Sequence, residues 1–123
     1  MINIGNFYNS LVTGMVYLER IFEVLDIEPE IQDAPNAFEL PPIQGYVVFN
    51  DVKFGYKKDQ PIFEDLSFRV RSGETIALVG PTGAGKSTII NLMTRFYDVD
   101  EGEILVDGID IRKVTLNSLR NEI

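Results

Sequence analysis

The sequence predicts an α/β fold built around a phosphate-binding loop, and three adjacent segments carry that prediction. Residues 80–88 read Gly-Pro-Thr-Gly-Ala-Gly-Lys-Ser-Thr, which matches the P-loop (Walker A) pattern G-x-x-x-x-G-K-[ST]. The apolar run 74–79 before the loop is typical of a buried strand, and residues 87–96 after it place apolar side chains at helical spacing. Strand, glycine-rich turn and helix form the order that phosphate binding needs.

The loop residues have separate tasks in such a site. Gly83 and Gly85 let the backbone curve around an oxyanion because they carry no Cβ. Successive backbone N–H groups and the start of the helix then face the phosphates. Lys86 is expected to reach the β- and γ-phosphates, and the Ser87 hydroxyl is expected to bind Mg²⁺. The alternative is a glycine-rich turn without a ligand.

Segments on both sides of the loop predict further strands and one short helix. Residues 46–54 and 62–70 favour strands. Residues 103–111 favour a hairpin that turns at Asp107-Gly108, because Asp-Gly suits a two-residue hairpin turn. Thr115 is expected to cap a short final helix through its hydroxyl group.

Apolar residues at three- and four-residue intervals predict an amphipathic helix over residues 5–26. They are Phe7, Leu11, Met15, Leu18, Phe22 and Leu25. Residues 1–18 carry no charge, but their asparagines make them too polar for a full membrane span. The helix either packs on its own domain or is the cytoplasmic end of a membrane helix. Residues 27–45 hold four of the six prolines and no basic residue, which predicts an extended acidic linker.

Composition excludes several kinds of chemistry. The chain has no Cys and no His, which rules out disulfides and thiolate or imidazole metal sites. A formal net charge of −8 disfavours nonspecific nucleic-acid binding, which needs clustered basic charge. Asp107 and Asp110 are interpreted as a turn residue and a solvated residue in preference to a catalytic carboxylate pair. No catalytic residue is assigned.

Tyr56 is the candidate for contact with the base of a nucleotide. It lies 24 residues before Gly80, on the predicted turn after the first strand, where an aromatic ring can stack on adenine. The alternative is a core or hairpin tyrosine. The candidate nucleotide-binding residues are therefore Tyr56, Gly80, Pro81, Thr82, Gly83, Ala84, Gly85, Lys86, Ser87 and Thr88.

Several segments together resemble ATP-binding cassette (ABC) exporters of the multidrug and lipid-exporter type. Residues 48–56 resemble the first cassette strand, which ends in the aromatic residue that stacks on adenine. Residues 73–80 resemble the strand that enters the P-loop, and residues 97–108 resemble the stretch after the P-loop helix. Residues 19–26 resemble the segment in which the last transmembrane helix leaves the bilayer. The resemblance runs from about residue 15 to the last residue.

The resemblance implies a P-loop NTPase fold and a division of the chain into three parts. Residues 1–26 would be the cytoplasmic end of the last transmembrane helix, an amphipathic helix that precedes the rest. Residues 27–45 would be an acidic, proline-rich linker. Residues 46–123 would be the N-terminal part of a nucleotide-binding domain: a β-subdomain with the P-loop strand and helix of a partial ABC ATPase domain.

The resemblance also implies ligands and partners. ATP and Mg²⁺ are the expected ligands, with Tyr56 as the adenine platform. The parent protein would couple ATP binding and hydrolysis to the export of a substrate, at the cytoplasmic face of the cell membrane. Its expected partners are its own transmembrane domain and a second half-transporter, identical or different, and nucleic acid is not expected.

The chain departs from the family pattern after the P-loop region. The family continues with a glutamine that contacts the metal, an LSGGQ-like signature, an Asp-Glu pair and a histidine, and none of these follows the loop here. Hydrolysis by this chain alone is therefore not expected. Three alternatives stay open: another P-loop enzyme such as a small-molecule kinase, a binding module without turnover, and a fragment that does not fold because its sheet edges and apolar faces are uncovered.

Overall fold

The computed structural model describes residues 4–26, 29, 31–57 and 59–123. Residues 1–3, 27, 28, 30 and 58 lie outside the described residues, and small parts of the predicted segments 1–26, 27–45 and 46–123 lie there with them. The chain forms two compact units, Met1–Glu30 and Ile31–Ile123. The division into membrane-helix end, linker and nucleotide-binding part stays a prediction.

Helix α1, Ile4–Leu25, makes up the described part of the first unit except for Asp26 and Pro29. The helix predicted over residues 5–26 is thus confirmed. Its described apolar side chains are exposed, with Met15 at 71% and Leu25 at 70%; the side chains of Ile4 and Phe7 are not described. Among the described residues, no helix has both the length and the apolar character needed to cross a bilayer.

A four-stranded antiparallel sheet forms the frame of the second unit. The strands are β1 (Val47–Phe54), β2 (Phe63–Val70), β3 (Glu101–Val106) and β4 (Ile109–Asp110). They lie in the order β2-β1-β3-β4, so the strands predicted over residues 46–54 and 62–70 and the hairpin predicted over residues 103–111 are confirmed. In the register, Val48 lies opposite Arg69 on one side and Leu105 on the other.

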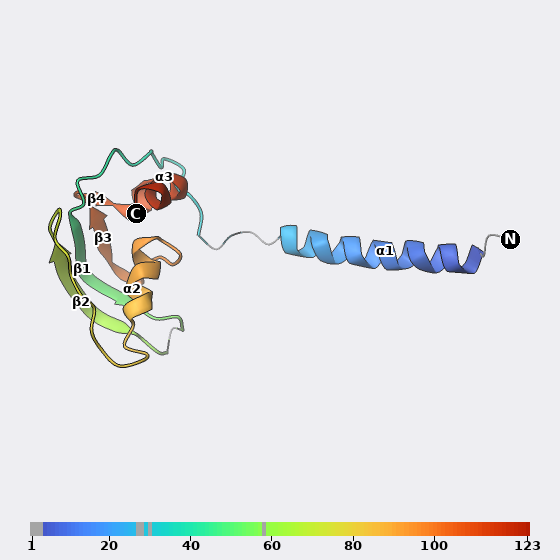
Figure 1. Ribbon diagram of the computed structural model, residues 1–123, viewed down its shortest axis with the longest axis horizontal. Helices are drawn as coiled ribbons and strands as arrows, with labels where there is room; N and C mark the ends of the chain where they lie inside the picture. The colour runs from blue at the N-terminus through green and yellow to red at the C-terminus, as the bar shows by residue number, and fades with distance from the viewer. Residues whose placement is uncertain (1–3, 27–28, 30, 58) are drawn as a thin grey trace. The chain divides into compact units, whose positions relative to one another are not determined.

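Helices α2 (Lys86–Met93) and α3 (Leu116–Glu122) lie on the same side of this sheet (Figure 1). The core fills the space between them and the sheet. Burying such side chains stabilises the fold by about 1.5–3 kcal/mol each. The fully buried members are Phe49, Val52, Leu92, Ile104, Val106, Val114 and Leu119.

Strand β1 contains a bulge that depends on Gly102 of the neighbouring strand. The register shifts between Asn50 and Lys53, and Asp51 has a φ of 48°. Gly102 has a φ of 83°, and a Cβ placed on it would lie 2.3 Å from the carbonyl oxygen of Asp51. Only glycine suits a position with both a left-handed backbone and this close an approach.

The strand predicted before the loop is wrong: residues 74–79 do not form a buried strand. They have no regular secondary structure, and all six residues are exposed, with Val79 at 89%. A strand needs a neighbouring backbone to satisfy its N–H and C=O groups. Within the described residues, all sheet pairing is among β1 to β4, and this segment has no such neighbour.

The predicted linker residues 31–45 lie against the second unit. Phe38 and Val114 form a parallel β-bridge, in which Phe38 N–H donates to Lys113 O at 3.2 Å. Leu40 is 7% exposed, and its N–H donates to Ser118 Oγ at 2.9 Å. The segment passes over α3 before it enters β1 (Figure 1), so this part of the linker is a packed element of the unit.

The end of α2 is a Schellman motif with an arginine in the place of glycine. Phe96 N–H donates to Asn91 O at 2.8 Å and Arg95 N–H donates to Leu92 O at 3.0 Å, which is the motif's hydrogen-bond pattern. Arg95 takes the left-handed position, with a φ of 51°. A left-handed conformation costs a residue with a Cβ about 1–2 kcal/mol. The motif ends the helix at Met93, earlier than the predicted residue 96.

Helix α3 begins as predicted. The Thr115 hydroxyl accepts a hydrogen bond from Ser118 N–H at 3.4 Å, which caps the helix start. The prediction for Asp110 is wrong, because its side chain is buried, at 8% exposed for the residue, and is ion-paired with Arg112 at 2.7 Å. The pair forms because Asp110 caps the 3-10 turn Ile111–Lys113 and thereby holds Arg112 beside its carboxylate.

The hairpin turn at Asp107-Gly108 has the backbone that its sequence predicts. Asp107 has a φ of 50° and Gly108 a φ of 82°, as a two-residue turn of this type requires. The Asp107 carboxylate also accepts hydrogen bonds from the N–H groups of Gln44 and Tyr46. It therefore fixes the point at which residues 31–45 enter β1.

Asp107→Asn should lower the free energy of unfolding at neutral pH, and this deficit should shrink as the pH falls. The Tyr46 N–H is the largest cause that holds the pKa of Asp107 below its ordinary value; burial opposes it, and the N–H groups of Gln44 and Gly45 add to it. With the folded-state pKa below the unfolded one, the carboxylate stabilises the fold above the unfolded pKa, and this stabilisation is lost as the pH falls through the folded pKa.

Urea unfolding of the two proteins between pH 7 and the acid range, around the ordinary Asp value of about 3.9, measures this difference. Asp65→Asn, at an exposed position on β2, is the control. A deficit that stays constant over this range would contradict the prediction.

Candidate nucleotide-binding site

The phosphate loop leads directly into α2 and has the backbone that an anion site needs. Gly83 and Gly85 have φ values of 87° and 82°. Gly85 is the residue before the helix, and a Cβ on it would lie 2.6 Å from the Phe63 ring. No side chain caps the helix start, so its first N–H groups face the loop and suit an anionic ligand.

Lys86 closes over this loop. Its Nζ atom donates to the carbonyl oxygens of Gly80 and Pro81, at 2.8 Å in both cases. The ammonium group therefore lies beside Gly80 and Pro81, at the start of the loop. A phosphate group in the loop would offer this ammonium anionic acceptors, which form stronger hydrogen bonds than neutral carbonyls do.

Tyr56 and the loop line one cavity of about 470 Å³, which is in the size range of small-molecule and cofactor sites. Its lining combines an aromatic ring, an apolar side chain, hydroxyl groups, loop backbone and one cation. The lining residues are Tyr56, Ile62, Thr82, Gly83, Gly85, Lys86, Ser87 and Thr88. An aromatic ring and a phosphate loop that share one cavity match the two ends of a nucleotide.

The Tyr56 ring is held in place by α2 and by other aromatic rings. Its hydroxyl donates to Thr88 Oγ1 and accepts from Asn91 Nδ2, both at 3.3 Å. Phe54 and Tyr97 meet it edge-on, with centroids 5.1 and 5.0 Å away. About half of the residue, 49%, stays exposed and is available for stacking.

Seven of the ten sequence-predicted residues line this cavity, and Gly80, Pro81 and Ala84 do not. Gly80 and Pro81 contribute through the carbonyl groups that hold Lys86. Two residues were missed. Asn91 follows Thr88 by three positions on α2, and this helical spacing was the available signal. Ile62 gave no signal beyond its place before β2.

The residues present fit a magnesium nucleotide better than a metal held by protein alone. In the described ranges, no group of three or more acidic side chains could hold a metal ion. Ser87, which carries a hydroxyl group, is among the residues that line the cavity. Mg²⁺ commonly keeps several waters and binds phosphate oxygens, with only one or two ligands from the protein. The single hydroxyl group of Ser87 is therefore adequate as the protein ligand of a nucleotide-bound Mg²⁺.

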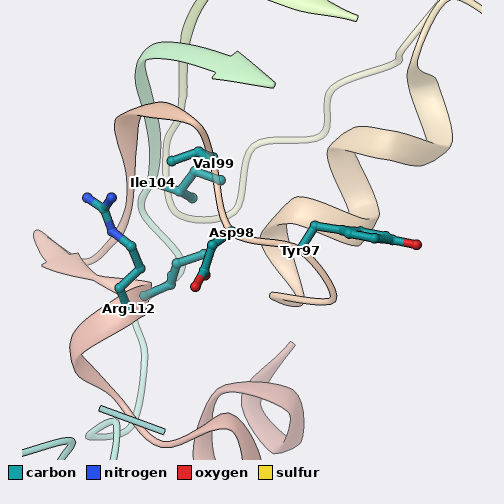
Figure 2. Close-up of a pocket in the computed structure, with 6 residues that line it drawn as sticks. Tyr97, Asp98, Val99, Ile104 and Arg112 are labelled. Atoms are coloured by element: carbon teal, nitrogen blue, oxygen red, sulfur yellow. The ribbon is translucent and has the colours of Figure 1, made fainter. Parts of the chain in front are cut away.

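Two other hollows do not suit a nucleotide. The depression drawn in Figure 2 is lined by Tyr97, Asp98, Val99, Ile104, Ile111 and Arg112, and its volume is about 0 Å³. In that view the Tyr97 ring points away from Asp98 and Arg112. The second hollow, about 280 Å³, is an apolar groove between the sheet, α2 and residues 76 and 78, and it carries no charged group.

Comparison with known proteins agrees with this geometry. Residues 63–123 match the family described as ABC transporter. A solved structure of a bacterial Atm1-family ABC exporter with ATP bound is 45% identical, with a TM-score of 0.76 over 95% of this chain and 21% of that one.

The chain belongs to the ABC transporter family. The predicted P-loop NTPase fold and ABC exporter resemblance are thereby confirmed.

Two curated members of the ABC transporter family illustrate how the chain relates to complete proteins. A fatty acid ABC transporter ATP-binding/permease protein of Mycobacterium bovis is 47% identical over 98% of this chain and 19% of its own length. An ATP-dependent lipid A-core flippase of Desulfotalea psychrophila is 45% identical over 94% of this chain and 20% of its own length. The chain spans about a fifth of the length of these relatives, and it corresponds to the ATP-binding part of such exporters.

Proposed function

We propose that this chain binds ATP with Mg²⁺ through the cavity formed by Tyr56 and the phosphate loop. The observation that carries the proposal is that an exposed aromatic ring and the loop with Lys86 line the same cavity of about 470 Å³. Adenine would stack on the Tyr56 ring. The loop N–H groups and the start of α2 would surround the phosphates.

Each polar residue has a role that its position supports. Lys86 would leave the carbonyl groups of Gly80 and Pro81 and neutralise the β- and γ-phosphates. Ser87 would ligate Mg²⁺ with its hydroxyl. Bound Mg²⁺ supplies charge neutralisation between the β- and γ-phosphates.

In the complete protein, we propose, this site drives export across a membrane. Relatives that are named as ATP-binding/permease proteins and as a lipid A-core flippase support this role. The ATP site would lie at the cytoplasmic face, joined to the protein's own transmembrane domain. A second half-transporter, identical or different, would complete the assembly.

Calorimetric titration of the 123-residue chain with ATP and Mg²⁺ tests the binding proposal. Saturable binding of ATP together with weaker binding of tripolyphosphate supports a site with both a base and a phosphate end. The proposal is contradicted if a soluble and folded chain releases no heat with either ligand and shows no shift in thermal unfolding temperature.

Tyr56→Ala should weaken ATP binding by about tenfold or more and leave tripolyphosphate binding unchanged, because stacking of a base on an aromatic ring contributes about 1–3 kcal/mol. Tyr56→Phe is the matched control, since it keeps the ring and loses only the hydroxyl bonds to Thr88 and Asn91, worth about 1 kcal/mol or less at 3.3 Å. If Tyr56→Ala lost equal affinity for ATP and for tripolyphosphate, stacking of the adenine base on Tyr56 would be excluded.

We also propose that this chain alone does not hydrolyse ATP. Its glutamines, Gln32, Gln44 and Gln60, all precede the phosphate loop in the sequence, and phosphoryl transfer needs a group that orients the attacking water. Phosphate release should therefore stay at the background rate in a continuous assay. Release above background that disappears in Lys86→Ala would overturn this proposal.

A further inference from the structure

Arg95 is the most unusual residue of the second unit in three independent respects. Its φ of 51° lies in the left-handed region, at the helix end where glycine is preferred. Its side chain is 5% exposed. Its Nη1 atom is buried and has no hydrogen-bond partner among the described residues. Each of these features costs stability, and such strain is concentrated at residues that serve function.

The contacts of Arg95 join three segments that are distant in sequence. Nε donates to Asp98 Oδ1 at 2.8 Å and Nη2 to Asp98 Oδ2 at 3.3 Å. Nη2 also donates to the carbonyl oxygen of Gln32 at 3.3 Å. Arg120 of α3 donates to the carbonyl oxygens of Thr94 and Arg95, at 3.0 and 2.9 Å. Residues 94 and 95, which directly follow α2, are therefore tied both to residue 32 and to α3.

Residues 31–33 are held from a second side as well. The Asp33 carboxylate accepts a hydrogen bond from Leu116 N–H, at the start of α3, at 2.7 Å. These residues open the second unit, and in sequence they follow the unit that contains α1. Hydrogen bonds thus connect Arg95, just after α2, with the first residues of the second unit.

The other end of α2 lies in the phosphate loop. The helix has eight residues, Lys86–Met93, and spans roughly 12 Å. Lys86, its first residue, is bonded to the carbonyl groups of Gly80 and Pro81, and a phosphate bound in the loop would compete for these donor contacts. A short, packed helix moves as one body, so a shift at its first turn reaches its last.

We propose that Arg95 is a positioning residue that relays occupancy of the phosphate loop to residues 31–33. This inference rests on the proposed binding of ATP. Phosphate draws Lys86 away from the loop carbonyls, α2 moves, and Arg95 shifts the Gln32 carbonyl with it. The ligand gives the two states different contacts at Lys86, which is the difference in free energy that a relay needs.

A single spin label tests the relay, because the chain has no cysteine that would compete for it. Ala34→Cys places the label at an exposed position directly after Asp33. Electron paramagnetic resonance then reports label mobility with and without Mg²⁺ and ATP, while calorimetry on each labelled protein reports ATP affinity. The labelled wild-type background should show a change in mobility on saturation with ATP.

Three substitutions separate a relay from a purely structural role. Arg95→Gly suits the left-handed backbone and removes the guanidinium group. Arg95→Lys keeps the positive charge but lacks the planar guanidinium group that bonds Asp98 and Gln32 together. Both should bind ATP and lose the mobility change, with a more mobile label before ATP is added. Arg112→Gln is the matched control, since Arg112 is also paired with an aspartate but has no bond to residues 31–33 among the described contacts. It should respond as the labelled wild type does.

Two results would overturn the relay without touching the proposed function: ATP binds but the wild-type label does not respond, or both Arg95 variants respond as the wild type does. If ATP does not bind the labelled wild type, both the proposed function and the relay are contradicted. The calorimetric titration with ATP identifies this case. Loss of ATP affinity in step with loss of fold in both Arg95 variants would assign Arg95 a structural role only.

Discussion

Lys86→Ala should reduce ATP affinity by about 100-fold or more. The Nζ atom of Lys86 already bonds the carbonyl groups of Gly80 and Pro81 at 2.8 Å, so it lies at the loop that would surround the phosphates. Hydrogen bonds to charged groups contribute about 1.5–3 kcal/mol each. Two such bonds to phosphate oxygens correspond to at least two powers of ten in the dissociation constant, at 1.4 kcal/mol for each.

Calorimetric titration with ATP and Mg²⁺ measures this loss, and circular dichroism verifies that the variant is folded. Lys53→Ala is the matched control, because Lys53 lies in β1, is ion-paired with Glu101 at 3.0 Å and does not line the cavity. It should bind ATP as the wild type does. Unchanged affinity in a folded Lys86→Ala protein would mean that the loop does not bind the phosphates.

Gly102→Ala should destabilise the fold by about 2–5 kcal/mol. Gly102 has a left-handed backbone, with a φ of 83°. A residue with a Cβ in this conformation destabilises the fold by about 1–2 kcal/mol. The methyl group would also lie 2.3 Å from Asp51 O and 2.5 Å from Asn50 O. Relief of this clash requires the bulge of β1 to move, at a further cost of about 1–3 kcal/mol.

Gly108→Ala separates the two contributions. Gly108 has nearly the same φ, 82°, but a Cβ on it would meet no atom within 4 Å. The free energy of unfolding of Gly108→Ala, measured in urea, should therefore fall by only about 1–2 kcal/mol, which is the contribution of the backbone conformation alone. Equal losses for the two variants would mean that the bulge adapts to the methyl group without cost.

Patterns carried by neighbouring residues predicted much of this fold. Asp107-Gly108 predicted the hairpin turn, Thr115 predicted the cap of α3, and the spacing of apolar residues predicted α1. Such features depend on backbone preferences and on contacts over a few positions. The loop glycines belong to the same class, because a positive φ is a local property of a residue without Cβ.

Residues 74–79 show where local pattern fails. An apolar run predicts burial and extension, but pairing requires a second backbone, and none of the described segments provides one. Ile76 and Leu78 instead line an open apolar groove beside α2, which is lined also by Phe49 and Phe68. The prediction of a solvated Asp110 failed for a related reason. Arg112 is ion-paired with its carboxylate and offsets the cost of its burial.

The sequence by itself indicated the phosphate loop, Tyr56 as a candidate and every α-helix and strand of the structure, although it also predicted a strand at residues 74–79 that does not form. Each of these indications depends on residue types at short fixed spacing. Only the tertiary structure decided that Tyr56 lines the same cavity as the loop, that residues 31–45 pack onto α3 and that Arg95 binds Gln32. These contacts join residues that are 26 to 78 positions apart, and their formation depends on how the sheet and helices pack together.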